Sequence, residues 1–153
     1  DAHALGVREG RPGSAGAQAV AKSLKPDDWK YLERLPLWLD FPELETIVVH
    51  AGLIPGVPLA NQTRDWCINL RSIAPDGSPQ KRGDAGVPWA STWPGPRFVV
   101  FGHDAVRGVQ HHPYALGLDS GCVYGKALTA VWLPQRTVVS VPAERVWQPI
   151  EPD

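Results

Sequence analysis

The 153-residue sequence has no methionine, only two cysteines, and no apolar run near the roughly 20 residues that a membrane span requires. Cys67 and Cys122 are too few for a disulfide framework. The two cysteines can form one disulfide bridge or remain as two reduced thiols, and the general burial of free cysteine favours the reduced thiols. Because reduced thiols suit a reducing compartment, we expect a cytoplasmic protein. The lack of methionine even at position 1 predicts a chain that is processed or belongs to a longer one.

Neither sign of charge dominates, since 15 Lys and Arg stand against 16 Asp and Glu and the formal net charge is −1. This balance gives no electrostatic reason to expect a nucleic acid partner, and the short apolar runs give none to expect a membrane partner. Hydrophobic residues make up 43% of the chain, which is enough at this length for one domain with its own core. We therefore predict a single domain over residues 1–153.

Hydrophobic periodicity and turn residues predict the order of the elements. Helices are expected at residues 17–24, 25–36 and 59–73, after a loop at 1–15. Strands are expected at residues 44–50, 97–103, 114–121, 127–134 and 136–143. Residues 74–96 are rich in Pro, Gly and charge and predict a long loop, pinned to the body by Trp89 and Trp93. The order favours a mixed α/β or α+β layered domain.

Two histidines stand where predicted apolar strands end. His50 closes TIVVH and is followed by Ala51 and Gly52, and His103 follows FVVFG. Ligands bind at the carboxyl ends of strands in layered α/β folds, and neutral imidazole is a common metal ligand. The alternative is a pair of half-buried structural histidines bound to the backbone. The spacing of 53 positions matches no fixed metal motif and leaves both interpretations open.

Four sequence blocks resemble the C-terminal motifs of calcineurin-like metallophosphoesterases: HAGLIPGVPLANQT, INLRSI, VVFGHDAVRGVQ and ALGLDSGCVYGKALTAVWLP. The resemblance runs from about Leu32 to Ala143 and is to the diadenosine-tetraphosphatase-like, PPP-related branch. It implies an α/β fold, the C-terminal portion of a four-layer α/β/β/α sandwich. It also implies two divalent metal ions (Mn, Fe, Zn or similar), with His50 and His103 among their ligands.

We assign candidate roles to four residues in addition to the two histidines. Arg71 is the candidate phosphate clamp, because a guanidinium binds phosphate bidentately; the alternative is a surface arginine on a helix. Tyr124 is expected to contact the leaving group of the substrate, or else to pack in the core. Asp104 is expected to support His103 or to have a structural role, since ligating histidines usually donate their second N–H to a neighbour. Asp119 either hydrogen-bonds near the site or holds a turn.

The resemblance also implies residues that this sequence does not contain. The upstream motifs GD-x-HG, GD-x-x-D and GNH-D/E are absent from residues 1–153, and Asp1 would be the acidic residue that closes the last of them. No catalytic acid is therefore assigned within the chain, since it is expected upstream of Asp1. The expected partner is the N-terminal portion of the same domain, without which we expect weak metal binding and little activity.

The leading hypothesis is a metal-dependent hydrolase that uses two metal ions to activate water against a phosphomonoester or phosphoanhydride. The candidate substrates are a phosphorylated small molecule (a dinucleoside polyphosphate or polyphosphate) and a phosphoprotein. The alternative is a degenerate phosphoesterase fold that serves as a non-catalytic scaffold or binding module. A third interpretation is an unrelated α/β binding protein, which would require the sequence match to be accidental.

Overall fold

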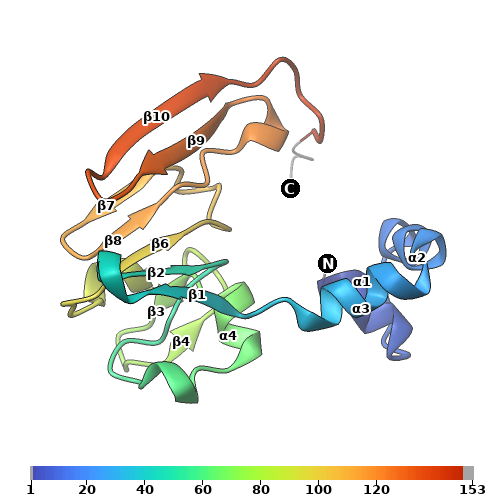
Figure 1. The fold of residues 1–153 in the computed structure, drawn as a ribbon, viewed down its shortest axis with the longest axis horizontal. Helices are drawn as coiled ribbons and strands as arrows, with labels where there is room; N and C mark the ends of the chain where they lie inside the picture. The colour runs from blue at the N-terminus through green and yellow to red at the C-terminus, as the bar shows by residue number, and fades with distance from the viewer. Residues whose placement is uncertain (1, 150–153) are drawn as a thin grey trace. The chain divides into compact units, whose positions relative to one another are not determined.

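The computed structural model describes residues 2–149, and for residues 2–4 it describes the backbone alone. The chain divides into two compact units, Asp1–Pro36 and Leu37–Asp153 (Figure 1). The prediction that residues 1–153 form a single domain stays a prediction. Among the described helices, none has the length and apolar character needed to cross a membrane.

Three short helices make the first unit: α1 (Ala2–Arg8), α2 (Ala15–Ser23) and α3 (Pro26–Arg34). Ser14 caps α2 by accepting a hydrogen bond from the backbone N–H of Ala17 at 3.2 Å. Pro26 begins α3, because a proline at the first helical position loses no hydrogen bond. Leu5 and Trp29 are buried together and form the small core of this unit. Helix α1 lies where the sequence predicts a loop.

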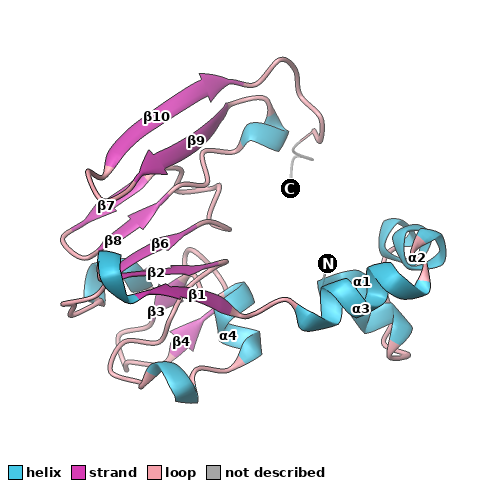
Figure 2. Ribbon diagram, viewed as in Figure 1, coloured by secondary structure: helices cyan, strands magenta, loops and turns pink. Residues whose placement is uncertain are grey.

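A five-stranded sheet forms the centre of the second unit, in the order β1-β2-β6-β8-β7 (Figure 2). Its strands are β1 (Trp38–Phe41), β2 (Thr46–Val49), β6 (Phe98–Phe101), β7 (Gln110–His112) and β8 (Ala115–Gly117). The central strands β2, β6 and β8 are parallel, and the two edge strands are antiparallel to their neighbours. Parallel strands are usually buried on both faces, which explains the continuous apolar runs in β2 and β6.

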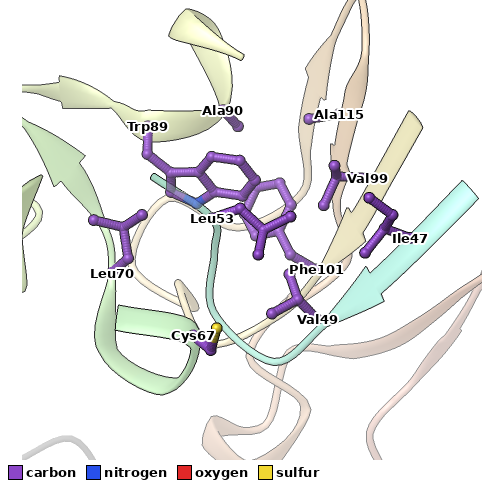
Figure 3. Packing of buried hydrophobic residues seen from close by; sticks show 10 residues of the cluster. All are labelled: Ile47, Val49, Leu53, Cys67, Leu70, Trp89, Ala90, Val99, Phe101 and Ala115. Atoms are coloured by element: carbon purple, nitrogen blue, oxygen red, sulfur yellow. The ribbon is translucent and has the colours of Figure 1, made fainter. Parts of the chain in front are cut away.

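Successive side chains of β6 point to opposite faces of the sheet and so serve two cores. Val99 and Phe101 belong to the larger core, drawn in Figure 3. That core consists of the buried residues Ile47, Val49, Leu53, Cys67, Leu70, Trp89, Ala90, Val99, Phe101 and Ala115. Phe98 and Val100 belong to the opposite core. Cys67 and Cys122 are both free thiols, which is the predicted alternative to a bridge.

The hairpin of β9 (Ala127–Trp132) and β10 (Thr137–Pro142) covers the second face of the sheet. Val131 and Val138 pair across this hairpin and pack against the core that contains Phe98 and Val100. Two β layers therefore face each other. The predicted mixed α/β class is confirmed, and the β-on-β packing matches the two central layers of the predicted sandwich.

The segment predicted as a long loop is more ordered than its composition suggests. It contributes β4 (Pro79–Gln80) and β5 (Val87–Pro88), which flank β3 (Ser72–Ile73) in a three-stranded sheet. The short helix η3 (Trp89–Thr92) follows and buries Trp89 to 1% exposure. The predicted pinning of this segment by Trp89 is confirmed, since its indole N–H donates to the Ala51 carbonyl at 3.1 Å.

Gly52 explains how Trp89 reaches that carbonyl. A Cβ atom at position 52 would lie 2.6 Å from the Trp89 ring, which is closer than atoms can approach. The glycine therefore lets the indole approach the backbone that follows His50. The core and the loop that carries His50 are joined at this contact.

Candidate functional site

His50 and His103 meet at the carboxyl ends of two neighbouring parallel strands. His50 follows β2 directly, and His103 is separated from β6 only by Gly102. The Gly102 N–H donates to the His50 carbonyl at 2.8 Å, which joins the two loops. The two imidazole rings lie with their centroids 5.0 Å apart and their planes tilted by 55°. The sequence-based expectation that both histidines lie at strand ends is confirmed by this geometry.

The backbone of His103 has an unfavourable conformation. Its φ of 68° lies in the left-handed region, which histidine tolerates better than most residues but which still costs energy. Its Nε2 atom is buried and has no hydrogen-bond partner among the described residues. Strained backbone and an unpartnered buried nitrogen are features that proteins keep at binding sites.

Both imidazoles are held in their neutral form. Burial lowers the pKa of His103 to about 4, the neighbouring Arg71 and His50 act in the same direction, and Asp104 and Asp119 oppose them. Burial also lowers the pKa of His50 below its ordinary 6.5. A neutral imidazole with a free nitrogen is the form that binds metal ions, so this pair fits a divalent cation. Within residues 2–149, however, no three or more His, Cys, Asp or Glu side chains gather as a ligand set.

Arg71 lies beside the histidine pair. The predicted helix over 59–73 is shorter in the structure, as η2 (Leu59–Asn61) and α4 (Arg64–Asn69), so Arg71 stands just before β3 and the helical-surface interpretation is wrong. Its guanidinium donates to the Lys81 carbonyl at 2.9 Å and to the His103 carbonyl at 3.4 Å. Its predicted role in binding phosphate stays a prediction.

A cavity of about 590 Å³ opens between these groups. It is lined by Arg71, His103, Ala105, Val106, Tyr124, Lys126, Gln148 and Pro149. Tyr124 belongs to η4 (Cys122–Tyr124), and the backbone N–H groups of Trp147 and Gln148 both donate to the Val123 carbonyl. The candidate phosphate clamp, one candidate metal ligand and the tyrosine thus share one cavity.

Asp104 is buried, with 3% of its surface exposed. Its Oδ2 atom accepts hydrogen bonds from Arg107 at 2.6 Å and from Gln110 at 3.4 Å, and its Oδ1 atom lies 3.9 Å from the Arg71 Nε. The carboxylate therefore faces two arginines, while its charge favours protonation of His103. Its predicted support of His103 stays a prediction.

Arg107 is a residue of this region that the sequence analysis missed. Its guanidinium donates to the Arg71 carbonyl at 3.1 Å, to the Ser72 hydroxyl at 2.8 Å and to the Gly83 carbonyl. Together with Asp104 it joins the turn after β6 to β3 and to the segment that follows β4. The spacing Asp104-x-x-Arg107 was the available signal, since residues three apart can pair within one turn.

We expect Asp104→Asn to destabilise the complete protein by about 3 kcal/mol, because it leaves the largely buried Arg107 guanidinium without its charged partner. Urea unfolding measures this loss, and we expect the dependence of the unfolding free energy on urea concentration to stay unchanged. Asp84→Asn is the matched control, because Asp84 pairs with Arg82 in an exposed ion pair. An Asp104→Asn variant as stable as this control would contradict the buried role of the carboxylate.

Asp119 holds a turn, since its Oδ1 atom accepts a hydrogen bond from the Gly121 N–H at 3.1 Å. Its charge also favours protonation of His50 and of His103, so it stands near the pair. The two alternatives stated for Asp119 are therefore compatible with each other. Asp1, predicted to close an upstream motif, lies outside the described residues.

The sequence of this chain is also similar to those of curated proteins. Curated relatives called bis(5'-nucleosyl)-tetraphosphatase PrpE [asymmetrical] are 31% identical over 118 residues in Halalkalibacterium halodurans and 39% identical over 116 residues in Geobacillus thermodenitrificans. These alignments cover 74% and 72% of this chain but 46% and 45% of the relatives. The Bacillus subtilis protein of that name is 31% identical over 128 residues, which is 80% of this chain and 50% of the relative. The chain thus spans about half the length of the curated relatives it matches.

A solved structure is also similar to this chain. It is described as that of "a putative diadenosine tetraphosphatase" and superimposes with a TM-score of 0.80 at 38% sequence identity, covering 92% of this chain and 63% of the other. No protein-family model matches the chain.

The α/β fold with its two facing β layers is consistent with part of a metallophosphoesterase fold. Within that class, the chain belongs to the calcineurin-like family, in its diadenosine-tetraphosphatase-like branch.

Proposed function

We propose that the complete protein containing residues 1–153 is a metal-dependent phosphoesterase that hydrolyses a phosphoanhydride bond of dinucleoside polyphosphates. The observation that carries the proposal is the pair of imidazole rings, with centroids 5.0 Å apart, at the ends of β2 and β6. The names of the relatives favour a dinucleoside tetraphosphate over the other candidate substrates, a phosphomonoester, inorganic polyphosphate or a phosphoprotein.

His50 and His103 would hold part of the metal centre through their neutral nitrogens. Two divalent ions, when bound, would polarise the phosphoryl group and supply a water of lowered pKa. The remaining ligands and the catalytic acid would come from the N-terminal portion of the same domain, since the described residues hold no larger ligand set. Assembly with that portion is part of the proposal.

Arg71 would bind the equatorial oxygens of the phosphate under attack. Its guanidinium is held in place by the Lys81 and His103 carbonyls, which use one N–H on each terminal nitrogen and leave others for a ligand. Fixed donors of this kind stabilise charge that develops in the transition state without reorganisation. Tyr124, on the wall of the same cavity, would contact the leaving group.

Metal removal tests the proposal in the complete protein. After treatment with a chelator, we expect hydrolysis of diadenosine tetraphosphate to fall about a hundredfold or more, and to return when Mn²⁺, Fe²⁺ or Zn²⁺ is added. An asymmetrical cut, as in the name of the relatives, gives ATP and AMP as products.

Two outcomes would contradict the proposal. Full activity in protein shown to be free of metal would exclude the metal-dependent mechanism. No hydrolysis with any of these metals would favour the non-catalytic scaffold instead.

A further inference from the structure

A second cavity, of about 570 Å³, adjoins the one that contains His103. It is lined by Arg71, Lys81, Arg82, Gly83, Asp84, Asp104, Val106 and Arg107, and we call it the basic cavity. Arg71 and Val106 line both cavities. A ligand bound at Arg71 can therefore extend from one cavity into the other.

Positive charge dominates the lining of the basic cavity. Four of its residues are cationic and two are aspartates, so the lining carries a net charge of about +2 at neutral pH. The two aspartates are not equivalent. Asp104 is buried against Arg107, whereas Asp84 is exposed and pairs with the still more exposed Arg82, at 2.9 Å between Nε and Oδ1.

The two outer cations of the basic cavity, Lys81 and Arg82, can exchange their carboxylate partners for a ligand. Arg82 is 78% exposed, and Lys81 is 49% exposed in an ion pair with Asp65 at 2.8 Å. Exposed pairs of this kind contribute little, so a multiply charged anion can replace the carboxylates. A guanidinium binds carboxylate and phosphate oxygens with the same bidentate geometry, so a phosphate can take the place of Asp84 on Arg82, and its higher charge favours the exchange.

We propose that the basic cavity binds the part of a phosphoanhydride chain that lies beyond the phosphate under attack. This inference rests on the proposed function, because Arg71 is taken to hold the reacting phosphate. From Arg71 the phosphate chain would pass to Lys81 and Arg82, which directly follow β4. A phosphomonoester, which has no further phosphate, would reach Arg71 alone. The cavity would thus make the site selective for chains of linked phosphates.

Substrate comparison in the complete, metal-loaded protein tests the inference. We expect Arg82→Ala to lower the ratio of kcat/KM for diadenosine tetraphosphate to kcat/KM for p-nitrophenyl phosphate about tenfold or more, mainly through KM. Asp84→Asn removes the competing carboxylate and is expected to shift the same ratio in the opposite direction. A general loss of folding cannot change the substrate ratio in opposite directions in variants of two neighbouring exposed residues.

Arg64→Ala is the matched control, since it removes one positive charge from the exposed start of α4, outside the lining of the basic cavity. We expect this control to leave the substrate ratio unchanged. Equal effects of Arg82→Ala and Arg64→Ala would indicate attraction by net charge only and would overturn the inference. An unchanged ratio in both Arg82→Ala and Asp84→Asn would overturn it as well.

A third substrate, inorganic tripolyphosphate, distinguishes a cavity that binds phosphates alone from one that binds a phosphate chain carrying a nucleoside. If hydrolysis of inorganic tripolyphosphate falls with that of diadenosine tetraphosphate in Arg82→Ala, the cavity binds the phosphates alone. If only diadenosine tetraphosphate is affected, the inference still holds and the bound chain is one that carries a nucleoside. Failure of the proposed function is distinguishable, because the unsubstituted protein would then not hydrolyse diadenosine tetraphosphate.

Discussion

Replacing His103 by glycine is expected to abolish most of the activity of the complete protein while leaving its stability nearly intact. Loss of a metal ligand removes several kcal/mol of transition-state stabilisation, which corresponds to about a thousandfold or more in kcat/KM. Glycine adopts a φ of 68° without steric cost, so the substitution relieves the strain that His103 carries. The half-buried ring contributes packing that offsets this relief.

Two measurements check the His103→Gly prediction together. Metal content by elemental analysis is expected to fall with kcat/KM for diadenosine tetraphosphate. The melting temperature is expected to change little when both proteins are compared without metal, since bound metal stabilises the folded state by itself. Activity within tenfold of the unsubstituted protein would exclude His103 from the metal centre.

Replacing Trp89 by alanine is expected to give a large loss of stability, about 3–5 kcal/mol. The indole is 1% exposed, packs against Phe101 with ring centroids 4.9 Å apart, and donates its N–H to the Ala51 carbonyl (Figure 3). Removing it leaves a cavity in the larger core and a buried carbonyl without its donor. Urea unfolding of the complete protein measures the loss.

Trp132→Ala is the matched control for the Trp89 prediction. Trp132 lies on β9 and is 67% exposed, so its removal is expected to change stability by only about 0.5 kcal/mol. Trp89→Phe is expected to fall between the two, because it keeps an aromatic ring but loses the donor and part of the buried volume. Equal losses in Trp89→Ala and Trp132→Ala would contradict the core position of Trp89.

The elements that the sequence predicted well are those with a strong local pattern. Strands β2 and β6 are continuous apolar runs because both of their faces are buried, and this same pattern placed His50 and His103 at the strand ends. Strands β9 and β10 lie on either side of a short turn, and both were likewise predicted.

The elements that were missed depend on their partners rather than on their own residues. Strands β1 and β7 are short edge strands that exist by pairing with β2 and β8. His111 and His112 therefore lie in β7, although a polar pair before a proline gives no strand pattern. Arg107 was missed for a similar reason, since its partners Ser72 and Gly83 lie 35 and 24 positions away in the chain.

Those long sequence separations have a kinetic consequence. Arg107 joins the turn after β6 to the start of the β3–β4 hairpin and to the segment that follows it, so its hydrogen bonds form only after large loops of chain have closed. Contacts of this kind are gained late in folding and are lost together when a region opens locally. The placement of Arg71 beside His103 is thus expected to open and close cooperatively with the hairpin, as one unit.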